Sequence, residues 1–252
     1  MKRAFVIRAH LDQLKISSAI PSNYWRVRVL QEVNSTQDEL KNELVSNGDC
    51  VVAEFQSAGR GRLDRSFKSE PSVGLLFSFY IKPTRVSGWG WIPLVAGIAV
   101  AQTLNEMTMV QGFLTKWPND VLSESGKVCG ILCERFGDGI IVGIGINVTT
   151  KPDELPVETA SSIFITTGLE IDRNDLLAKL LLTFQGHFLS WESGIDLIPR
   201  YRALSETIGR EISVLLPDSR TIQGRATGIT QEGELLLESG EVISVGDIQH
   251  LR

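Results

Sequence analysis

The sequence predicts an α+β fold with two domains, residues 1–204 and 205–252. Apolar runs at 74–81 and 140–148 lack strict alternation, which indicates strands covered on both faces. A run of small apolar residues at 91–107 predicts a buried helix between these strands. Beyond the expected boundary the pattern changes to short strands separated by tight turns. That pattern predicts a small β-barrel of about five strands.

The composition is ordinary for a globular protein of 252 residues, and the formal net charge is −5. An acidic chain is a poor partner for nucleic acid or for a membrane surface. The longest apolar run, 91–101, is far shorter than the roughly 20 residues that cross a bilayer, and no signal peptide follows Met1. The three cysteines lack the spacing of a disulfide framework or a zinc site, which indicates reduced thiols and a cytoplasmic location.

The N-terminal part predicts a helix, a strand and a second helix. Residues 8–16 are expected to form one helix, and the segment before Trp25 is too short for a three-helix DNA-binding module. A strand is expected at 25–30. Ser35 is a good N-cap for the next helix, although its hydroxyl could equally face a ligand. The expected buried stripe and C-terminal cap of that helix are Leu40, Leu44, Val45 and Gly48.

The segment 55–67 follows an apolar strand and carries two glycines and three arginines between Gly59 and Arg65. Glycine lets backbone N–H groups approach a ligand, and arginine brings a permanent charge suited to carboxylate and phosphate oxygens. The same composition suits a surface loop or a nucleic-acid-binding segment, but it is not repeated and the chain is acidic. We interpret it as a flap that closes over a small anionic ligand.

Two later strands carry residues of chemical interest. Within 127–134, strict alternation places Gly130 on the face opposite Lys127, and Lys127 is either an edge charge or a functional cation. A glycine inside a strand indicates a close approach by another group. In the last strand of the domain, Gly143 and Gly145 lie side by side. They leave a smooth floor for a flat ligand or for another part of the chain.

The remaining elements are a turn and a long helix. The segment 115–121 predicts a strand that enters a turn at Pro118, followed by the turn-forming residues Asn119 and Asp120. Asp172 is expected to cap a helix on which His187 packs rather than binds a ligand. The two buried rows expected on this helix are Leu176, Leu180 and Phe184, and Leu177, Leu181 and Phe188.

Several of these segments coincide with the motifs of one family, and the chain resembles a biotin protein ligase in its short form, without an N-terminal DNA-binding domain. The motifs occur in the family's order and spacing over most of 25–148. They are Asn34-Ser35-Thr36-Gln37, Gln56-Ser57-Ala58-Gly59-Arg60-Gly61-Arg62, Lys116-Trp117-Pro118-Asn119-Asp120, Lys127-Val128-Cys129-Gly130-Ile131-Leu132 and Gly143-Ile144-Gly145-Ile146-Asn147-Val148. The resemblance implies a mixed β-sheet flanked by helices, like that of class II aminoacyl-tRNA synthetases, followed by an SH3-like barrel.

The resemblance also implies roles for individual residues. Those implied as catalytic are Lys127, Arg60 and Arg62. Those implied to bind biotin are Ser35, Thr36, Gln37, Gln56, Gly59, Arg60, Gly61, Arg62, Lys127, Gly130, Gly143 and Gly145. Those implied to bind ATP are Arg62, Arg65, Phe67, Lys116, Asn119 and Asn147. Mg²⁺ would arrive with ATP, near Asn119, and no metal site is expected from the protein alone.

The implied enzyme is an ATP-dependent ligase that forms a carbon–nitrogen bond. Biotin and ATP would give biotinyl-5′-AMP and pyrophosphate. The biotinyl group would then pass to a lysine of the biotin carboxyl carrier domain of acetyl-CoA carboxylase or a related carboxylase. Fixed cations and backbone N–H groups would stabilise the charge that develops when the two anions meet. Asp120 is a candidate for orienting the attacking amine, and a homodimer and a monomer both remain open.

Two alternatives and one departure accompany this resemblance. A lipoate ligase or octanoyltransferase has a related fold, and a non-catalytic biotin-binding regulator or repressor would keep the pocket. The flap and the retained Lys127 argue against these alternatives. The family usually has a basic or polar residue, glycine and tryptophan where this chain has Leu63, Asp64 and Phe67. We expect a flap that retains the adenylate less tightly, because Asp64 adds negative charge and Phe67 offers less stacking area.

Overall fold

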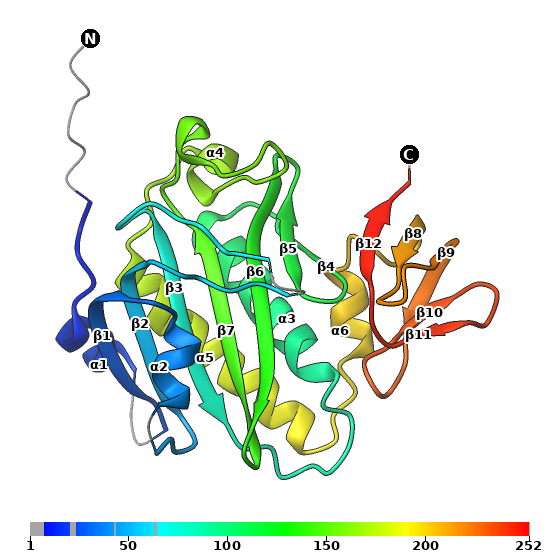
Figure 1. Ribbon diagram of the computed structural model, residues 1–252, viewed down its shortest axis with the longest axis horizontal. Coiled ribbons are helices and arrows are strands. Elements are labelled where there is room, and N and C mark those ends of the chain that lie inside the picture. Colours follow the sequence, from blue (N-terminus) through cyan, green and yellow to red (C-terminus); the bar gives the residue numbers. More distant parts are fainter. Residues whose placement is uncertain (1–7, 21–23, 43, 63–64, 252) are drawn as a thin grey trace.

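A mixed sheet of seven strands forms the body of the protein (Figure 1). The computed structural model describes residues 8–20, 24–42, 44–62 and 65–251. The strand order across the sheet is β1-β2-β3-β7-β6-β5-β4. The strands are β1 (Arg26–Val33), β2 (Asp49–Gln56), β3 (Gly74–Ile81), β4 (Leu114–Lys116), β5 (Asp120–Ser123), β6 (Gly126–Phe136) and β7 (Gly139–Asn147).

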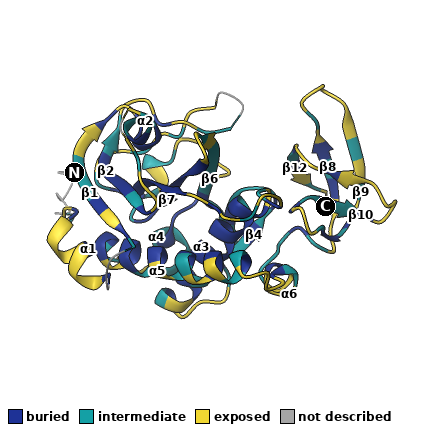
Figure 2. Cartoon of the chain, turned by 90° about the horizontal axis from the view of Figure 1, so that it is seen from below, coloured by how far each residue is buried: buried dark blue, intermediate teal, exposed yellow. Residues whose placement is uncertain are grey.

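Helices cover both faces of this sheet. The two long helices α3 (Trp91–Thr108) and α5 (Arg173–Glu192) pack on one face, and the short helix α2 (Thr36–Lys41) packs on the other (Figures 1 and 2). The remaining helices are α1 (Gln13–Ala19), the 3₁₀ turn η1 (Pro152–Glu154), α4 (Ile163–Thr167) and α6 (Ile198–Ala203). The predicted mixed sheet flanked by helices is confirmed.

The only parallel pair of the sheet, among the described residues, is β1 with β2, and α2 makes the crossover between them. Parallel neighbours need such a connection, whereas antiparallel neighbours can be joined by a tight turn. The crossover brings the start of α2 and the end of β2 to the same edge of the sheet. Residues 35–37 and Gln56 therefore meet although about twenty positions separate them.

The apolar pattern of β3 explains the layered core. Every residue of β3 is buried, with Leu75, Phe77, Phe79 and Ile81 in the main core beneath α3 and α5. Tyr80 points the other way, into a smaller cluster under α2. Burial on both faces is the condition under which a strand loses its alternation. The predicted rows of α5 are buried as expected.

A buried ion pair joins the N-terminal segment to this core. Glu54 of β2 and Arg173 of α5 lie 2.7 Å apart, and their side chains are 5% and 4% exposed. Glu54 also accepts a hydrogen bond from the backbone N–H of Leu11, 2.5 Å away. Arg173 donates to the carbonyl of Gly74 at 3.1 Å. The satisfied partners explain how two charges are tolerated there.

Three expectations for the N-terminal half were wrong. The first helix begins at Gln13, capped by Asp12, rather than spanning 8–16. Helix α2 ends at Lys41, so Leu44 is fully exposed, and Gly48 (φ +91°) forms the turn before β2 instead of capping the helix. Ser35 does occupy the expected N-cap position, and because its side chain makes no capping hydrogen bond, its hydroxyl is left for the alternative role of facing a ligand.

The C-terminal part forms the predicted small β-domain. Its antiparallel strands are ordered β11-β10-β9-β8-β12. They are β8 (Glu211–Leu215), β9 (Thr221–Ile229), β10 (Leu235–Leu237), β11 (Val242–Ile243) and β12 (Asp247–His250). Two indole N–H groups of the larger domain donate to its carbonyls: Trp91 to Thr230 at 3.2 Å and Trp117 to Gly233 at 3.2 Å. These contacts dock the turn between β9 and β10 against the larger domain. Within the described residues, no helix has the length and apolarity that a membrane span requires.

Candidate active site

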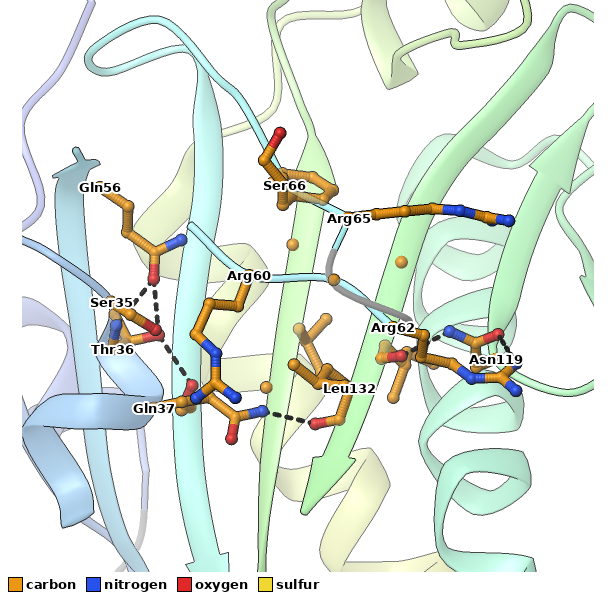
Figure 3. Close-up of a pocket in the computed structure, with 18 of the residues that line it drawn as sticks. Ser35, Thr36, Gln37, Gln56, Arg60, Arg62, Arg65, Ser66, Asn119 and Leu132 are labelled. Carbon is orange, nitrogen blue, oxygen red and sulfur yellow. Dashed lines mark hydrogen bonds between the residues drawn. The ribbon is translucent and has the colours of Figure 1, made fainter. Parts of the chain in front are cut away.

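A pocket opens on the face of the sheet that carries α2, above β6 and β7 (Figure 3). The described part of the flap, with Arg60, Arg62, Arg65 and Ser66, crosses over it. Most of the predicted site residues line this pocket: Ser35, Thr36, Gln37, Gln56, Arg60, Gly61, Arg62, Arg65, Phe67, Asn119, Lys127, Gly130, Gly143 and Gly145. The fold thus gathers residues that the chain carries more than a hundred positions apart.

Hydroxyl and amide groups form one end of the pocket. Gln56 Oε1 accepts from the backbone N–H of Thr36 at 2.7 Å and from its hydroxyl at 3.0 Å. The same hydroxyl lies 2.7 Å from the Ser78 hydroxyl of β3. Ser35, Thr36 and Ser78 are all buried. This network fixes the start of α2 and presents small polar groups to a ligand.

Gln37 provides a buried acceptor beside this network. Its Nε2 donates to the carbonyl of Leu132, 2.7 Å away, which identifies the other terminal atom as the oxygen. That oxygen is buried and has no hydrogen-bond partner among the described residues. A buried acceptor without a donor is costly, so the arrangement suits a ligand that brings an N–H group.

The floor of the pocket consists of glycines, as predicted. Gly130 and Gly145 pair directly across β6 and β7. A Cβ added at Gly145 would lie 2.6 Å from Cζ of Phe67, and one at Gly143 would lie 2.6 Å from Nε2 of Gln37. Both distances are below van der Waals contact, so only glycine permits these approaches. The ring of Phe67 rests on this floor, rather than standing at the rim of the pocket.

The flap is held by a few backbone hydrogen bonds. Phe67 N–H donates to Gly59 at 2.9 Å, and Gly61 N–H donates to Arg65 at 2.7 Å. A Cβ at Gly59 would lie 2.3 Å from the carbonyl oxygen of Phe67, which explains the glycine at this crossing. Leu63 and Asp64 lie outside the described residues, so the part of the weaker adenylate retention that was attributed to Asp64 stays a prediction.

The three flap arginines are divided between the two ends of the pocket. Arg60 pairs with Asp38 at 2.8 Å and with Glu134 at 2.7 Å, at the end near α2. Arg62 donates to Asn119 Oδ1 at 3.1 Å, at the opposite end. Arg65 pairs there with Asp247, the first residue of β12. The pocket therefore offers a cation to each of two anionic groups.

Lys127 reaches the pocket because β6 contains a bulge. Val121 pairs with Cys129 and Leu122 pairs with Lys127, which leaves Val128 as the extra residue. The prediction that Lys127 and Gly130 lie on opposite faces was therefore wrong. A Cβ at Gly130 would lie 3.3 Å from Nζ of Lys127, so both residues face the pocket.

Asp120 holds the Lys127 ammonium in place. Its Oδ1 lies 2.6 Å from Nζ of Lys127. The backbone of Lys127 is fastened as well, because its N–H donates to Thr159 at 2.9 Å and its carbonyl accepts from Ser161 at 2.7 Å. A cation fixed in this way needs little rearrangement to meet developing negative charge.

Three predicted site residues do not line the pocket. Gly59 shapes the flap from outside. Lys116 is half-buried on β4, where burial lowers the pKa of its ammonium. Asn147 is buried at the end of β7, where its Nδ2 donates to the carbonyl of Ser161 at 2.8 Å. An ATP-binding role for Lys116 and Asn147 stays a prediction.

Several pocket residues escaped the sequence analysis, and the polar side chains of Ser78 and Asp247 are two of them. Ser78 is the only polar residue of β3, and its position in an apolar strand was a signal that could have found it. Asp247 lies in the C-terminal domain, and no motif around it distinguishes it from other surface acids. The two carboxylates Asp120 and Asp247 do not form a metal site. Within the described parts of the chain, no group of three or more His, Cys, Asp or Glu side chains could hold a metal ion.

Comparison with known proteins gives consistent matches along the chain. Residues 28–150 match the Biotin/lipoate A/B protein ligase family, and residues 207–251 match the Biotin protein ligase C terminal domain. The chain is 34% identical over 261 residues to the biotin–[acetyl-CoA-carboxylase] ligase of Mycobacterium tuberculosis, with 98% of each chain covered. It is 31% identical over 231 residues to the bifunctional ligase/repressor BirA of Escherichia coli, with 86% of this chain and 70% of that protein covered.

Solved structures agree with these matches. The biotin protein ligase from Aquifex aeolicus in complex with biotin and ATP superimposes with a TM-score of 0.78 at 34% identity. The superposition covers 90% of this chain and 98% of that one. The predicted fold class is therefore supported over the larger domain and the small β-domain together.

Proposed function

This chain belongs to the biotin protein ligase family, and on that premise we propose how its pocket performs the reaction. The protein is an ATP-dependent biotin ligase. The carboxylate of biotin attacks the α-phosphorus of ATP, pyrophosphate leaves, and biotinyl-5′-AMP forms. A neutral amine then attacks the acyl carbon, and AMP leaves as the amide bond forms.

The end of the pocket near α2 suits the ring system of biotin. Biotin carries a flat ureido group with two N–H donors and one carbonyl acceptor. The unpartnered Gln37 oxygen is an acceptor for one N–H, and the Ser35 hydroxyl can donate to the carbonyl; the Thr36 hydroxyl can donate there once it releases Gln56. The glycine floor lets a flat ring lie against the backbone of β7. Phe67 would have to leave this floor, or move along it, as the ring enters.

The cations suit the two anions that must meet. The observation that carries the proposal is the set of four cations that line one pocket above a glycine floor: Arg60, Arg62, Arg65 and Lys127. Lys127 lies between the polar end and the end near β12, next to Gly130. We assign Lys127 and Arg62 to the charge that develops on the α-phosphoryl oxygens, and Arg60 to the carboxylate of biotin.

Each of these assignments requires an exchange of partners. Arg60 and Lys127 pair with Glu134 and Asp120 in this structure. An incoming carboxylate or phosphate replaces one anion by another, so the guanidinium and ammonium need not be desolvated without compensation. Asp120, once released, lies where it can accept a hydrogen bond from the attacking lysine amine.

Magnesium would enter with the triphosphate. Mg²⁺ keeps several waters and is usually held by one or two protein oxygens together with phosphates, which fits a pocket with few carboxylates. The Asn119 amide oxygen and the Asp120 carboxylate are the groups of the pocket that could contact it. When bound, the ion neutralises charge on the departing pyrophosphate.

The acceptor we propose is a lysine of the biotin carboxyl carrier domain of acetyl-CoA carboxylase or a related carboxylase, and the proposed location is the cytoplasm. The relatives named as biotin ligases favour biotin over lipoate or octanoate, and ligation over binding alone. Whether the chain acts as a homodimer is a separate question that the pocket does not bear on.

Release of pyrophosphate on mixing the protein with biotin and MgATP tests the first step. A carrier domain, followed by mass spectrometry of its modified lysine, tests the second step, and lipoate in place of biotin tests the acyl specificity. Lys127→Ala should slow pyrophosphate release, whereas Lys179→Ala should not. Lys179 is the matched control because it pairs with Glu106 on the opposite face of the sheet. Equal rates with lipoate, or no pyrophosphate at all, would contradict the proposal.

A further inference from the structure

The C-terminal domain contributes one carboxylate to the pocket. Asp247 begins β12 and lines the pocket together with Arg62 and Arg65. Its carboxylate pairs with Arg65 and lies 3.9 Å from the nearest guanidinium nitrogen of Arg62. The neighbouring carbonyl of Gly246 accepts from Arg62 at 3.4 Å. The flap is therefore held from the side of the C-terminal domain.

The backbone that carries Asp247 is well fixed. Strand β12 pairs with β8, with Asp247 opposite Leu215. A Cβ added at Gly246 would lie 2.5 Å from a side-chain carbon of Val214, so the chain passes close to its neighbour here. The Asp247 side chain is 24% exposed, against 66% for Arg65. The carboxylate is thus the more buried member of the pair and is carried by a paired strand, whereas the arginine is the more exposed member.

The Asp247 carboxylate lies where it offsets the repulsion between neighbouring cations. Arg62 and Arg65 line one end of the pocket, the half-buried Lys116 lies outside this lining, and the like charges of these groups repel one another. Asp247 lies in their midst and interacts favourably with each of them. The negative charge of Asp247 reduces the repulsion between these cations, so they can lie close together before a more highly charged anionic ligand binds.

We propose that Asp247 is a positioning residue for ATP: it holds Arg62 and Arg65 of the flap over the end of the pocket where the triphosphate binds. The inference rests on the proposed function, because it assigns the phosphates of ATP to this end. A guanidinium carries five N–H donors, so Arg65 can keep its bond to Asp247 and still donate to a phosphate oxygen. The small β-domain thereby helps to bind the nucleotide through the flap, without touching the reacting atoms.

The test is Asp247→Asn, which keeps the size of the side chain and removes its charge. We expect the KM for ATP in pyrophosphate release to rise about three- to ten-fold, the range for a partly exposed ion pair. The affinity for biotin measured without ATP should stay within two-fold. Asp247→Glu should recover most of the loss. The matched control is Asp218→Asn, which removes an arginine–carboxylate pair of the same domain, with Arg220, on the turn between β8 and β9.

A double-mutant cycle separates this role from a general effect on folding. If Asp247 acts through Arg65 as well as Arg62, then Arg65→Ala and Asp247→Asn together should raise the KM by less than the product of the two single effects. Additive effects, or an unchanged or lower KM for ATP in Asp247→Asn, would overturn the inference. If the wild-type protein itself releases no pyrophosphate, the proposed function is wrong. That outcome is distinguishable from a failure of the Asp247 inference, in which the wild-type protein is active and the variant has an unchanged KM for ATP. Unchanged melting temperatures of the variants exclude misfolding as the cause.

Discussion

Gly145→Ala is the sharpest test of the glycine floor. The added methyl carbon would lie 2.6 Å from Cζ and 2.7 Å from Cε1 of the Phe67 ring. Carbon atoms are in optimal contact at about 3.5–4.0 Å, so whatever lies on the floor must rise by about 1 Å. Overpacking of this kind costs about 1–3 kcal/mol. If the ring system of biotin lies on this floor, the Kd for biotin should rise about 5- to 150-fold.

Isothermal titration of biotin into the wild-type protein and the variant measures this change directly. Gly224→Ala is the matched control, because Gly224 is also a strand glycine and its added Cβ would meet only Leu237, at an ordinary 3.6 Å. A Kd for Gly145→Ala within two-fold of the wild-type value would refute the assignment of the floor to biotin. The alternative, that the floor exists only for Phe67, makes a different prediction. In that case Phe67→Ala combined with Gly145→Ala would restore the affinity to that of Phe67→Ala alone.

Four further outcomes follow from contacts described above. Lys127→Ala should slow biotinyl-5′-AMP formation by roughly a hundred-fold or more, measured by single-turnover quench, because a fixed cation is lost from the transition state. Glu54→Gln should lower the free energy of unfolding by about 3–5 kcal/mol in urea titrations, since it leaves Arg173 buried without its counter-ion. Burial lowers the pKa of His187 to about 4 from 6.5, so the unfolded chain binds the proton first and stability should decline as the pH falls from about 6.5 to 4. His187→Gln should flatten that decline. Gly186→Ala, on the exposed face of α5 with nothing within 4 Å of the added carbon, should raise the melting temperature, because it adds about 0.5–1 kcal/mol of helix propensity.

The sequence predicted the elements that are strongly patterned. The bounds of β3 agree with the expected 74–81, and α3 begins at the expected Trp91, because long apolar runs leave few alternatives. Helix α2 was predicted too long, since Leu44 continued an apolar period that nothing in the fold buries. Propensity alone does not show where a partner surface ends. Asp12 was not recognised as the cap of α1, although an Asp at a helix start is a local signal that the sequence carried.

The motifs predicted which residues form the pocket, but they did not predict how these residues are arranged in space. The motifs gave the residues around Ser35, Gly59 and Gly143; the parallel crossover brings the first two groups together, and the strand order β2-β3-β7 places the third beside them. Two features lay beyond them. The face of Lys127 depends on a bulge that alternation cannot anticipate. The contribution of Asp247 depends on how a separate domain docks, which is a matter of tertiary contact.

Because β6 has a bulge at Val128, the face of the sheet on which Lys127 lies depends on the number of residues between Asp120 and Lys127. One residue more or fewer in the hairpin formed by β5 and β6 would turn the ammonium of Lys127 away from the pocket and toward α3, with the composition of the chain otherwise unaltered. A relative could therefore retain every motif and still be inert through a single-residue deletion. Judging such sequences requires the spacing between Asp120 and Lys127 to be read along with their identities.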